Sequence, residues 1–266
     1  MELIILGSGA TQPPPRPYCE CNVCKEARKK GIPYLRTGPS LFIKDVNVLI
    51  DTPGEIRLQL TREKIKRVDA VFYTHWHPDH TIGCTIFEQM NWNLKKWKAI
   101  RATKVFFPKG SLDDLRKYKL SGVIDYAIKL KTIDAKEINE NSVIKFKRIL
   151  IRPIKIGAVW GYSIEEGKKK ILYAPCDIMD LPKLKLKNYD LFIIELGWLR
   201  KRLKGKENEL LSFYDILEAI KKFKPKNVIF SHIEENRGSH KELKKLEKKY
   251  KRFNVKIAYD GMKVKI

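Results

Sequence analysis

Strand-like hydrophobic runs recur along the chain and outnumber the segments with helical spacing. Runs rich in Val, Ile, Phe and Tyr predict strands at 2–6, 40–44, 47–50, 69–74, 103–107, 142–152, 159–164, 170–174, 190–195, 227–231, 254–258 and 263–266. Hydrophobic residues three or four positions apart predict helices at about 54–63, 80–90, 111–118, 208–223 and 239–251. Because the helices come singly between groups of strands, the pattern indicates a layered α/β sandwich.

The rest of the chain contains no repeat and no long Gly- or Ser-rich linker. The segment 91–101 is expected to form a loop or short helix, with its two tryptophans packing against the protein. No hydrophobic run approaches the ~18 residues of a membrane span. The opening residues 1–7 are expected to form a first strand, not a signal peptide. We therefore expect a cytoplasmic protein that does not enter a membrane.

The chain is strongly basic. It holds 55 Lys and Arg residues against 31 Asp and Glu residues, a formal net charge of +24. Such a field attracts anions, and phosphates above all. A surface rich in Lys and Glu is also typical of proteins from hyperthermophiles, where the charges are simply solvated. The charge is therefore compatible with a phosphate-containing substrate or a nucleic acid, and requires neither.

Three of the five histidines lie in one short run, 74–80, directly after a predicted strand. In an extended segment, two histidines two residues apart point to the same side and can bind one ion. Pro78 is favoured at the first position of a helix, so the two residues after it point elsewhere, as a second ion requires. Imidazole and carboxylate groups suit Zn, Fe and Mn. The candidate ligands in this run are His75, His77, Asp79 and His80.

Two ions need further ligands, and the ends of other predicted strands offer them. Asp177 follows the strand at 170–174, and its two oxygens can bridge two ions. The alternative role for Asp177 is a helix N-cap. His232 directly follows the strand at 227–231, where the alternative is a core histidine with satisfied hydrogen bonds. We expect Asp51, at the end of another strand, to orient a ligand.

Three of the five cysteines fall within six residues. They are Cys19, Cys21 and Cys24. In a reducing compartment this spacing predicts a zinc site, which needs a fourth Cys or His ligand. The free candidates are Cys84, Cys176 and His240. The first two stand beside residues of the metal motif and are interpreted as packing groups, which favours His240.

One set of residues resembles the ligands of the metallo-β-lactamase superfamily: His75, His77, Asp79, His80, Asp177 and His232. The opening Gly7-Ser8-Gly9 and the closing Asp260-Gly261-Met262 fit as well, so the resemblance covers nearly the whole chain. It implies a four-layer αββα sandwich forming a single domain over 1–266, with a dinuclear site at one edge of the sheets. The cysteine cluster, in a zinc-binding loop at about 17–30, is similar to that of the branch that cleaves a cyclic ribosyl phosphodiester. The pyrroloquinoline-quinone branch shares it, so the substrate stays open.

Two positions depart from the family pattern. The family supplies a third His to the first metal, but the segment 151–159 contains none. This leaves the first metal with two histidines and Asp177. The phosphodiesterase branch also has a His that assists the phosphate, where this chain has Trp198. Lys155 is a candidate replacement for that positive charge.

Together these features predict a metal-dependent hydrolase that acts on a small or cyclic phosphodiester. One or two Zn²⁺ or Mn²⁺ ions would activate water, with Asp79 orienting the water and Asp177 bridging the ions. A further Zn²⁺ would be structural. One alternative is a nuclease related to the tRNA 3′-end-processing ribonucleases, which the basic charge favours. Another is a non-catalytic protein that binds metal or nucleic acid, and a homodimer is compatible with each of these functions.

Overall fold

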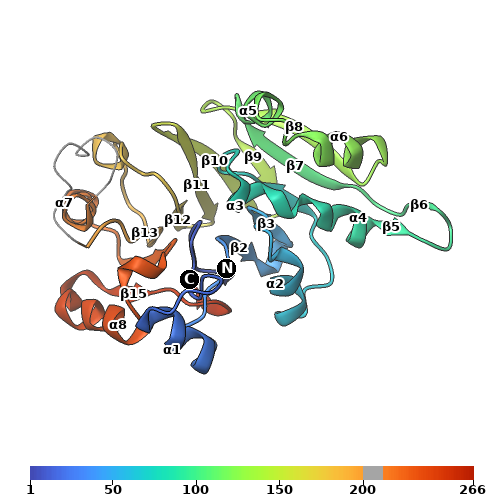
Figure 1. Ribbon diagram of the computed structural model, residues 1–266. Helices are drawn as coiled ribbons and strands as arrows, with labels where there is room; N and C mark the ends of the chain where they lie inside the picture. The colour runs from blue at the N-terminus through green and yellow to red at the C-terminus, as the bar shows by residue number, and fades with distance from the viewer. Residues whose placement is uncertain (200–211) are drawn as a thin grey trace.

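Two seven-stranded sheets form the centre of the protein. The computed structural model describes residues 1–199 and 212–266 (Figure 1). The first sheet has the order β16-β1-β2-β3-β4-β7-β8. Its strands are β16 (Met262–Lys265), β1 (Glu2–Gly7), β2 (Ser40–Ile43), β3 (Val48–Ile50), β4 (Ala70–Phe72), β7 (Thr103–Pro108) and β8 (Ile133–Ile138).

The second sheet has the order β15-β14-β13-β12-β11-β10-β9. Its strands are β15 (Val255–Ile257), β14 (Asn227–Ser231), β13 (Leu191–Glu195), β12 (Lys169–Ala174), β11 (Val159–Glu166), β10 (Ile149–Ile156) and β9 (Ile144–Phe146). Two further short strands, β5 (Trp92–Asn93) and β6 (Lys98–Ala99), form a hairpin that projects from the body of the protein (Figure 1).

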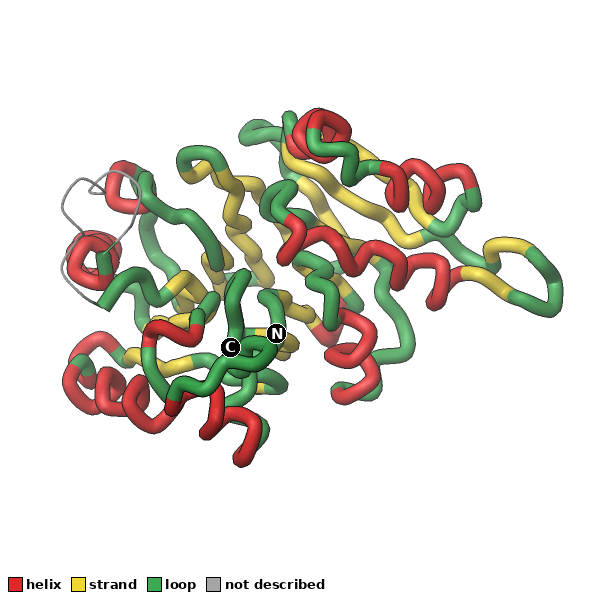
Figure 2. Tube along the Cα trace, in the orientation of Figure 1, coloured by secondary structure: helices red, strands yellow, loops and turns green. Residues whose placement is uncertain are grey.

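Helices cover the outer face of each sheet, as the red segments of Figure 2 show. Beside the first sheet lie α2 (Ile56–Arg62), α3 (Pro78–Thr81), α4 (Ile86–Asn91), α5 (Ser111–Lys117) and α6 (Gly122–Lys129). Beside the second lie α7 (Phe213–Phe223) and α8 (His240–Lys249), with α1 (Asn22–Lys30) next to α8 (Figure 1). Short 3₁₀ turns are η1 (Lys44–Val46), η2 (Ile82–Thr85), η3 (Leu181–Lys183), η4 (Glu235–Arg237) and η5 (Lys251–Phe253).

Alternation along the strands explains why the layers stack. In β13, Leu191 and Ile193 join the core between the two sheets, whereas Phe192 and Ile194 join the core under α7. Successive side chains of a strand point to opposite faces, so a strand that is hydrophobic at every position must be covered on both sides. A third core lies between the first sheet and its helices. The predicted four-layer αββα sandwich is confirmed.

Parallel strands place the functional loops. In the second sheet β12, β13, β14 and β15 run parallel, and in the first sheet β3, β4, β7 and β8 do so. The carboxyl ends of neighbouring parallel strands meet at one edge of a sheet, which is where ligand-binding loops of α/β proteins gather.

Among the described residues, no helix is long and hydrophobic enough to cross a bilayer.

Several elements differ from the sequence-based expectation. The strand β8 and the helices α1 and α6 were not predicted, and the strand predicted at 142–152 is divided between β9 and β10. The segment 91–101 forms the β5–β6 hairpin, so the prediction of a loop or short helix was wrong there. The helix predicted at 80–90 is divided into α3, η2 and α4. Of the helix predicted at 208–223, residues 208–211 lie outside the described residues.

Candidate metal centre

Loops after three parallel strands supply the predicted ligands. The run with His75, His77, Asp79 and His80 follows β4, Asp177 follows β12, and His232 directly follows β14. Pro78 begins the short helix α3, as the sequence predicts. Asp51, Asp177 and His232 have left-handed backbones, with φ of 63°, 48° and 52°. This conformation is uncommon for residues other than Gly, and among the other residue types Asn, Asp and His adopt it most readily.

The six side chains form two neighbouring groups. In each, the candidate ligand atoms lie within 4.8 Å of one another. The first group is His75, His77 and Asp177, and the second is Asp79, His80 and His232. The rings of His75 and His80, one from each group, are 4.2 Å apart between centroids. Two ions held by these groups would therefore be neighbours, as in a dinuclear metal site.

Three buried nitrogen atoms of this cluster have no hydrogen-bond partner among the described residues. They are the Nε2 atoms of His75, His80 and His232. Buried polar atoms are nearly always paired, and a neutral imidazole nitrogen is the commonest metal ligand in proteins. Nitrogen and carboxylate donors together suit Zn²⁺ and Mn²⁺. The residues therefore fit a divalent metal.

A buried carboxylate beneath the cluster orients it. The Thr74 backbone N–H and Oγ1 donate to Asp51 at 2.8 and 2.9 Å, and Nδ1 of His80 lies 2.8 Å from Asp51 Oδ2. Thr74 Oγ1 also lies 3.0 Å from Nδ1 of His75. A carboxylate on Nδ1 leaves Nε2 free to bind metal and fixes the plane of the ring. Asp51 therefore has the geometry of the orienting residue that the sequence predicts.

Protonation in the cluster follows burial and neighbouring charge. Burial, together with the imidazoles of His80 and His77, lowers the pKa of His75 well below its ordinary value, so its ring is neutral. Burial opposes a charge on His80, but the Asp51 carboxylate raises its pKa. Burial alone would raise the pKa of Asp79, but His232 and His80 hold it below its ordinary value. Asp79 is therefore ionised and also accepts a hydrogen bond from Thr11 Oγ1 at 3.0 Å.

A cavity of about 220 Å³ opens beside the cluster. Its lining residues are Thr11, His77, Cys176, Asp177, Met179, Glu195, Trp198, His232, Glu234 and Arg237. Sequence reasoning missed Glu195 and Arg237, and Lys155 is exposed and does not line the cavity. An acidic residue at the carboxyl end of a central parallel strand is the signal that would have identified Glu195.

Glu195 is expected to make stability depend on pH. Burial raises its pKa from 4.5 to about 7, although it accepts a hydrogen bond from the Ile178 N–H at 3.0 Å. Because the folded pKa exceeds the unfolded one, this group stabilises the fold below pH 4.5 and that contribution is lost as the pH rises through 7. The difference is at most about 3 kcal/mol.

Glu195→Gln, which keeps the acceptor and removes the charge, should therefore stabilise the metal-free protein by about 1–3 kcal/mol at pH 8 and change little at pH 4. Denaturant unfolding in the presence of a chelator measures this. The exposed Glu218→Gln in α7 is the matched control. Equal effects of the two variants at pH 8 would contradict the role assigned to burial.

The cysteine cluster gathers around a carboxylate. Glu235 Oε2 lies 3.4, 3.7 and 3.6 Å from the sulfur atoms of Cys19, Cys21 and Cys24. His240 lies elsewhere, with Nδ1 3.3 Å from Nη2 of Arg36. Burial and then Arg36 lower the pKa of His240 to about 4. The structure therefore does not bring the predicted His240 to the thiols and places Glu235 there.

The four donors fit a structural zinc. Three thiols and one carboxylate lie within 4.8 Å of one another, and zinc takes four such ligands in a closed tetrahedron. Burial raises the pKa of Cys24 to about 12, so this thiol is protonated unless a cation stabilises the thiolate. Arg16 Nε donates to Glu235 at 2.8 Å and fixes its carboxylate. All five cysteines are free thiols.

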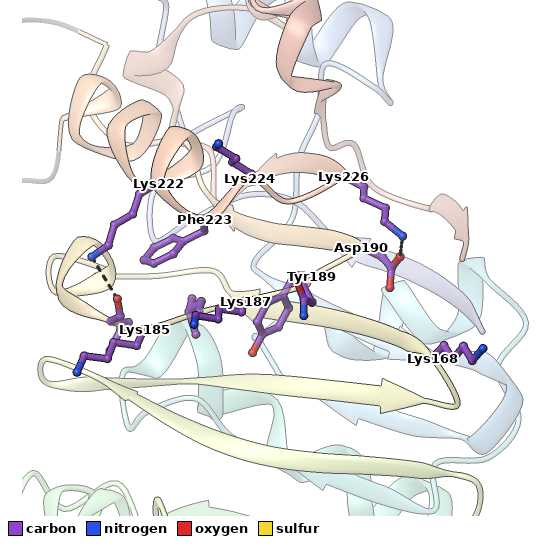
Figure 3. A pocket seen from close by; sticks show the side chains of 12 residues that line it. Lys168, Lys185, Lys187, Tyr189, Asp190, Lys222, Phe223, Lys224 and Lys226 are labelled. Carbon is purple, nitrogen blue, oxygen red and sulfur yellow. Dashed lines mark hydrogen bonds and ion pairs between the residues drawn. The ribbon is translucent and has the colours of Figure 1, made fainter.

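A basic groove of about 700 Å³ borders the second sheet, and Figure 3 shows the side chains that line it. Six lysines line it, together with Tyr189 and Phe223: Lys168, Lys185, Lys187, Lys222, Lys224 and Lys226. Lys226 pairs with Asp190 at 2.8 Å, and Lys222 donates to backbone oxygens. The groove borders the starts of β12, β13 and β14, whereas the candidate metal ligands Asp177 and His232 follow the ends of β12 and β14. It is therefore separate from the metal cluster.

Two facing sheets with a His- and Asp-lined site at one edge are the arrangement of the metallo-β-lactamase fold. A family model described as a beta-lactamase superfamily domain matches residues 46–233, and the chain belongs to this superfamily. It is 26% identical over 174 residues to ribonuclease Z of Pyrococcus horikoshii, an alignment that covers 65% of this chain and 47% of that protein. The chain spans less than half the length of the curated relatives it matches.

Solved structures share the fold over the full length of the chain. A diphosphatase from the PhnP family superimposes with a TM-score of 0.73 at 23% identity, covering 100% of this chain and 97% of that one. Zn²⁺-bound PqqB from Methylobacterium extorquens has a TM-score of 0.73 at 16% identity, with 100% of both chains covered. At these identities the likeness establishes the fold.

Proposed function

We propose that this protein is a metal-dependent phosphodiesterase that hydrolyses a small or cyclic phosphodiester. The observation that carries the proposal is the pair of three-ligand groups bordering one cavity, with three buried imidazole nitrogens free to bind metal. His75, His77 and Asp177 would hold one ion, and Asp79, His80 and His232 the other. A third His is absent from the first group, so we expect that ion to bind more weakly.

The chain's own residues would prepare the reaction. Bound Zn²⁺ or Mn²⁺ supplies Lewis-acid chemistry, lowering the pKa of water toward neutrality and offsetting charge on phosphoryl oxygens. Asp79, ionised and held by Thr11, would orient the attacking water. The water oxygen bonds to phosphorus, the P–O bond to the leaving group breaks, and the leaving oxygen takes a proton. The cavity of about 220 Å³ suits a compact substrate.

A small chromogenic substrate tests the proposal. Protein loaded with Mn²⁺ or Zn²⁺ should hydrolyse bis-p-nitrophenyl phosphate or a cyclic phosphodiester, lose the activity in chelator, and recover it when metal returns. Elemental analysis should give up to three ions per chain, one of them zinc at the cysteine cluster. Metal-loaded protein that cleaves no phosphodiester would overturn the proposal.

We place the protein in the cytoplasm because its clustered thiols suit a reducing compartment.

A second candidate function is the hydrolysis of RNA, which the match to ribonuclease Z and the lysine-lined groove favour. Within the described residues, no acidic side chain pairs with Lys185, Lys187 or Lys224. The groove and the metal cluster lie at opposite ends of β13, whose five residues span roughly 17 Å. A few nucleotides of single-stranded RNA could reach from one to the other.

RNA binding would depend on these lysines. If RNA is the substrate, the triple Glu variant of Lys185, Lys187 and Lys224 should weaken binding and reduce the slope of log K against log salt by about 2–3. The matched control is the triple Glu variant of Lys95, Lys96 and Lys98 in the β5–β6 hairpin, which changes the charge equally. Filter binding from 50 to 300 mM salt measures both. Equal slopes for the two triple variants would show that RNA does not bind in the groove.

A further inference from the structure

Arg237 is a cation built into the wall of the metal-site cavity. It ends the turn η4, five residues after His232, and its side chain is only 9% exposed. Among the described residues that line the 220 Å³ cavity, it is the only Arg or Lys. The same wall contains the carboxyl groups of Asp177, Glu195 and Glu234. Its position is therefore fixed by the same loop that carries a candidate metal ligand.

The guanidinium of Arg237 is held in place, but not all of its N–H donors have a hydrogen-bond partner among the described residues. Its central carbon lies 4.2 Å from the ring centroid of Trp198. Its Nη2 lies 3.4 Å from Glu234 Oε2, a long contact for an ion pair. Its buried Nε has no hydrogen-bond partner among the described residues. An Arg side chain stays charged in proteins, and buried charges are normally paired and fully hydrogen-bonded. The free donor therefore indicates a ligand that accepts hydrogen bonds.

We propose that Arg237, stacked on Trp198, binds the phosphate of the substrate through its guanidinium, whose Nε has no hydrogen-bond partner among the described residues. The proposal rests on the phosphodiesterase function proposed above and names the residue that recognises the anion. A planar guanidinium matches two phosphate oxygens, which an ammonium group cannot do. Stacking on an indole fixes the plane of that fork, so little conformational freedom is lost when phosphate binds.

The neighbouring groove indicates where the rest of the substrate lies. Arg237 and Trp198 also line a groove of about 540 Å³, beside Val23 of α1. The pair therefore stands between the metal-site cavity and this groove. A phosphate at Arg237 faces the metal ligands on one side and the groove on the other. The organic group of the phosphodiester would lie along the groove, against the Trp198 ring.

Phosphate affinity tests this role directly. Arg237→Gln in metal-loaded protein should weaken binding of inorganic phosphate, measured by calorimetry and as competitive inhibition, about ten- to a hundredfold. The matched control is Arg252→Gln, which removes another guanidinium stacked on a ring, that of Phe253, outside the site. It should change phosphate affinity less than twofold. Metal content should be unchanged in both variants, which a merely structural role for Arg237 would not predict.

The outcomes separate this proposal from the phosphodiesterase function. Phosphodiester hydrolysis with unchanged phosphate affinity in Arg237→Gln would overturn the role of Arg237 alone. Weakened phosphate binding in a protein that hydrolyses no phosphodiester would keep the anion site and overturn the proposed reaction. If Arg237→Gln loses metal or unfolds, Arg237→Met decides by the same affinity criterion, because it keeps the length and hydrophobic stem of the side chain.

Discussion

Asp177→Asn is expected to lower kcat/KM for bis-p-nitrophenyl phosphate by about a thousandfold or more. Asp177 is the carboxylate of the first group and borders the cavity, so in the proposed reaction its charge would hold metal beside the phosphate. An amide is a poor metal ligand by comparison, and removing the ligand removes stabilisation of the transition state. Asn is the informative substitution because Asp177 has a φ of 48°, which Asn adopts more readily than Ala does.

The matched control for this experiment is Asp180→Asn. Asp180 lies three residues later, pairs with Lys183 at 2.6 Å and does not line the cavity. It should keep at least half of the activity. The metal content of Asp177→Asn should fall by about one ion, and its unfolding transition should resemble that of the parent. Full activity in Asp177→Asn would exclude the first group from the reaction.

Cys24→Ser is expected to destabilise the protein by about 4 kcal/mol or more, because losing a structural metal belongs to the few changes with effects this large. Three thiols and Glu235 surround one position, and this group joins the loop before α1 to the turn η4. In a chain of this size the loss corresponds to roughly 10 °C in Tm. Zinc content should fall by one ion per chain, measured by elemental analysis alongside thermal unfolding.

Cys84→Ser is the comparison that isolates the metal. Cys84 is also a buried free thiol, but it packs under the first sheet near α4. Its replacement should leave zinc content unchanged. Since Arg237 lies on η4 two residues after Glu235, Cys24→Ser should also weaken phosphate binding. Normal zinc content in Cys24→Ser would show that the cysteine cluster does not hold a zinc ion.

The layers could be predicted from the sequence because most strands carry a strong local signal. Central strands such as β13 are hydrophobic at every position before the last, since both of their faces are covered. The edge strand β8 was missed because it reads Ile-Asp-Ala-Lys-Glu-Ile and is buried mainly at its ends. Helix α1 was missed because it is mostly polar and only Cys24 and Ala27 are buried. Edges and surface helices depend on contacts that local patterns do not contain.

The gathering of the six candidate ligands could be predicted for a different reason. These residues stand at strand ends, and the spacing of His75, His77, Asp79 and His80 has few other uses. The fourth donor at the cysteines was not predictable in this way. His240 has the expected chemistry, but α8 turns it toward Arg36, whereas η4 brings Glu235 to the thiols. A carboxylate carries no distinctive signal in a chain with 31 acidic residues.

Arg237 is a second residue whose proposed role could not be predicted from the sequence. One arginine among 55 basic residues is unremarkable in sequence, and its role depends on burial and on the ring of Trp198. Trp198 was identified only as the place where an expected His is absent. We propose that the positive charge for which Lys155 was a candidate comes instead from Arg237, on a turn in a distant part of the chain. Contacts of this kind arise from tertiary structure alone.

The left-handed backbones of Asp51, Asp177 and His232 restrict the substitutions that this site can accept during evolution. Each costs on the order of 1 kcal/mol or more, a cost that the surrounding fold must offset. Exchanging one side chain for another at these positions is therefore not a purely chemical event, because residues other than Gly, Asn, Asp and His adopt this backbone less readily, so that Cys or Glu would strain the chain further. Substitutions to Cys or Glu that change the metal preference should therefore be tolerated better at His75 and His77 than at Asp177 and His232.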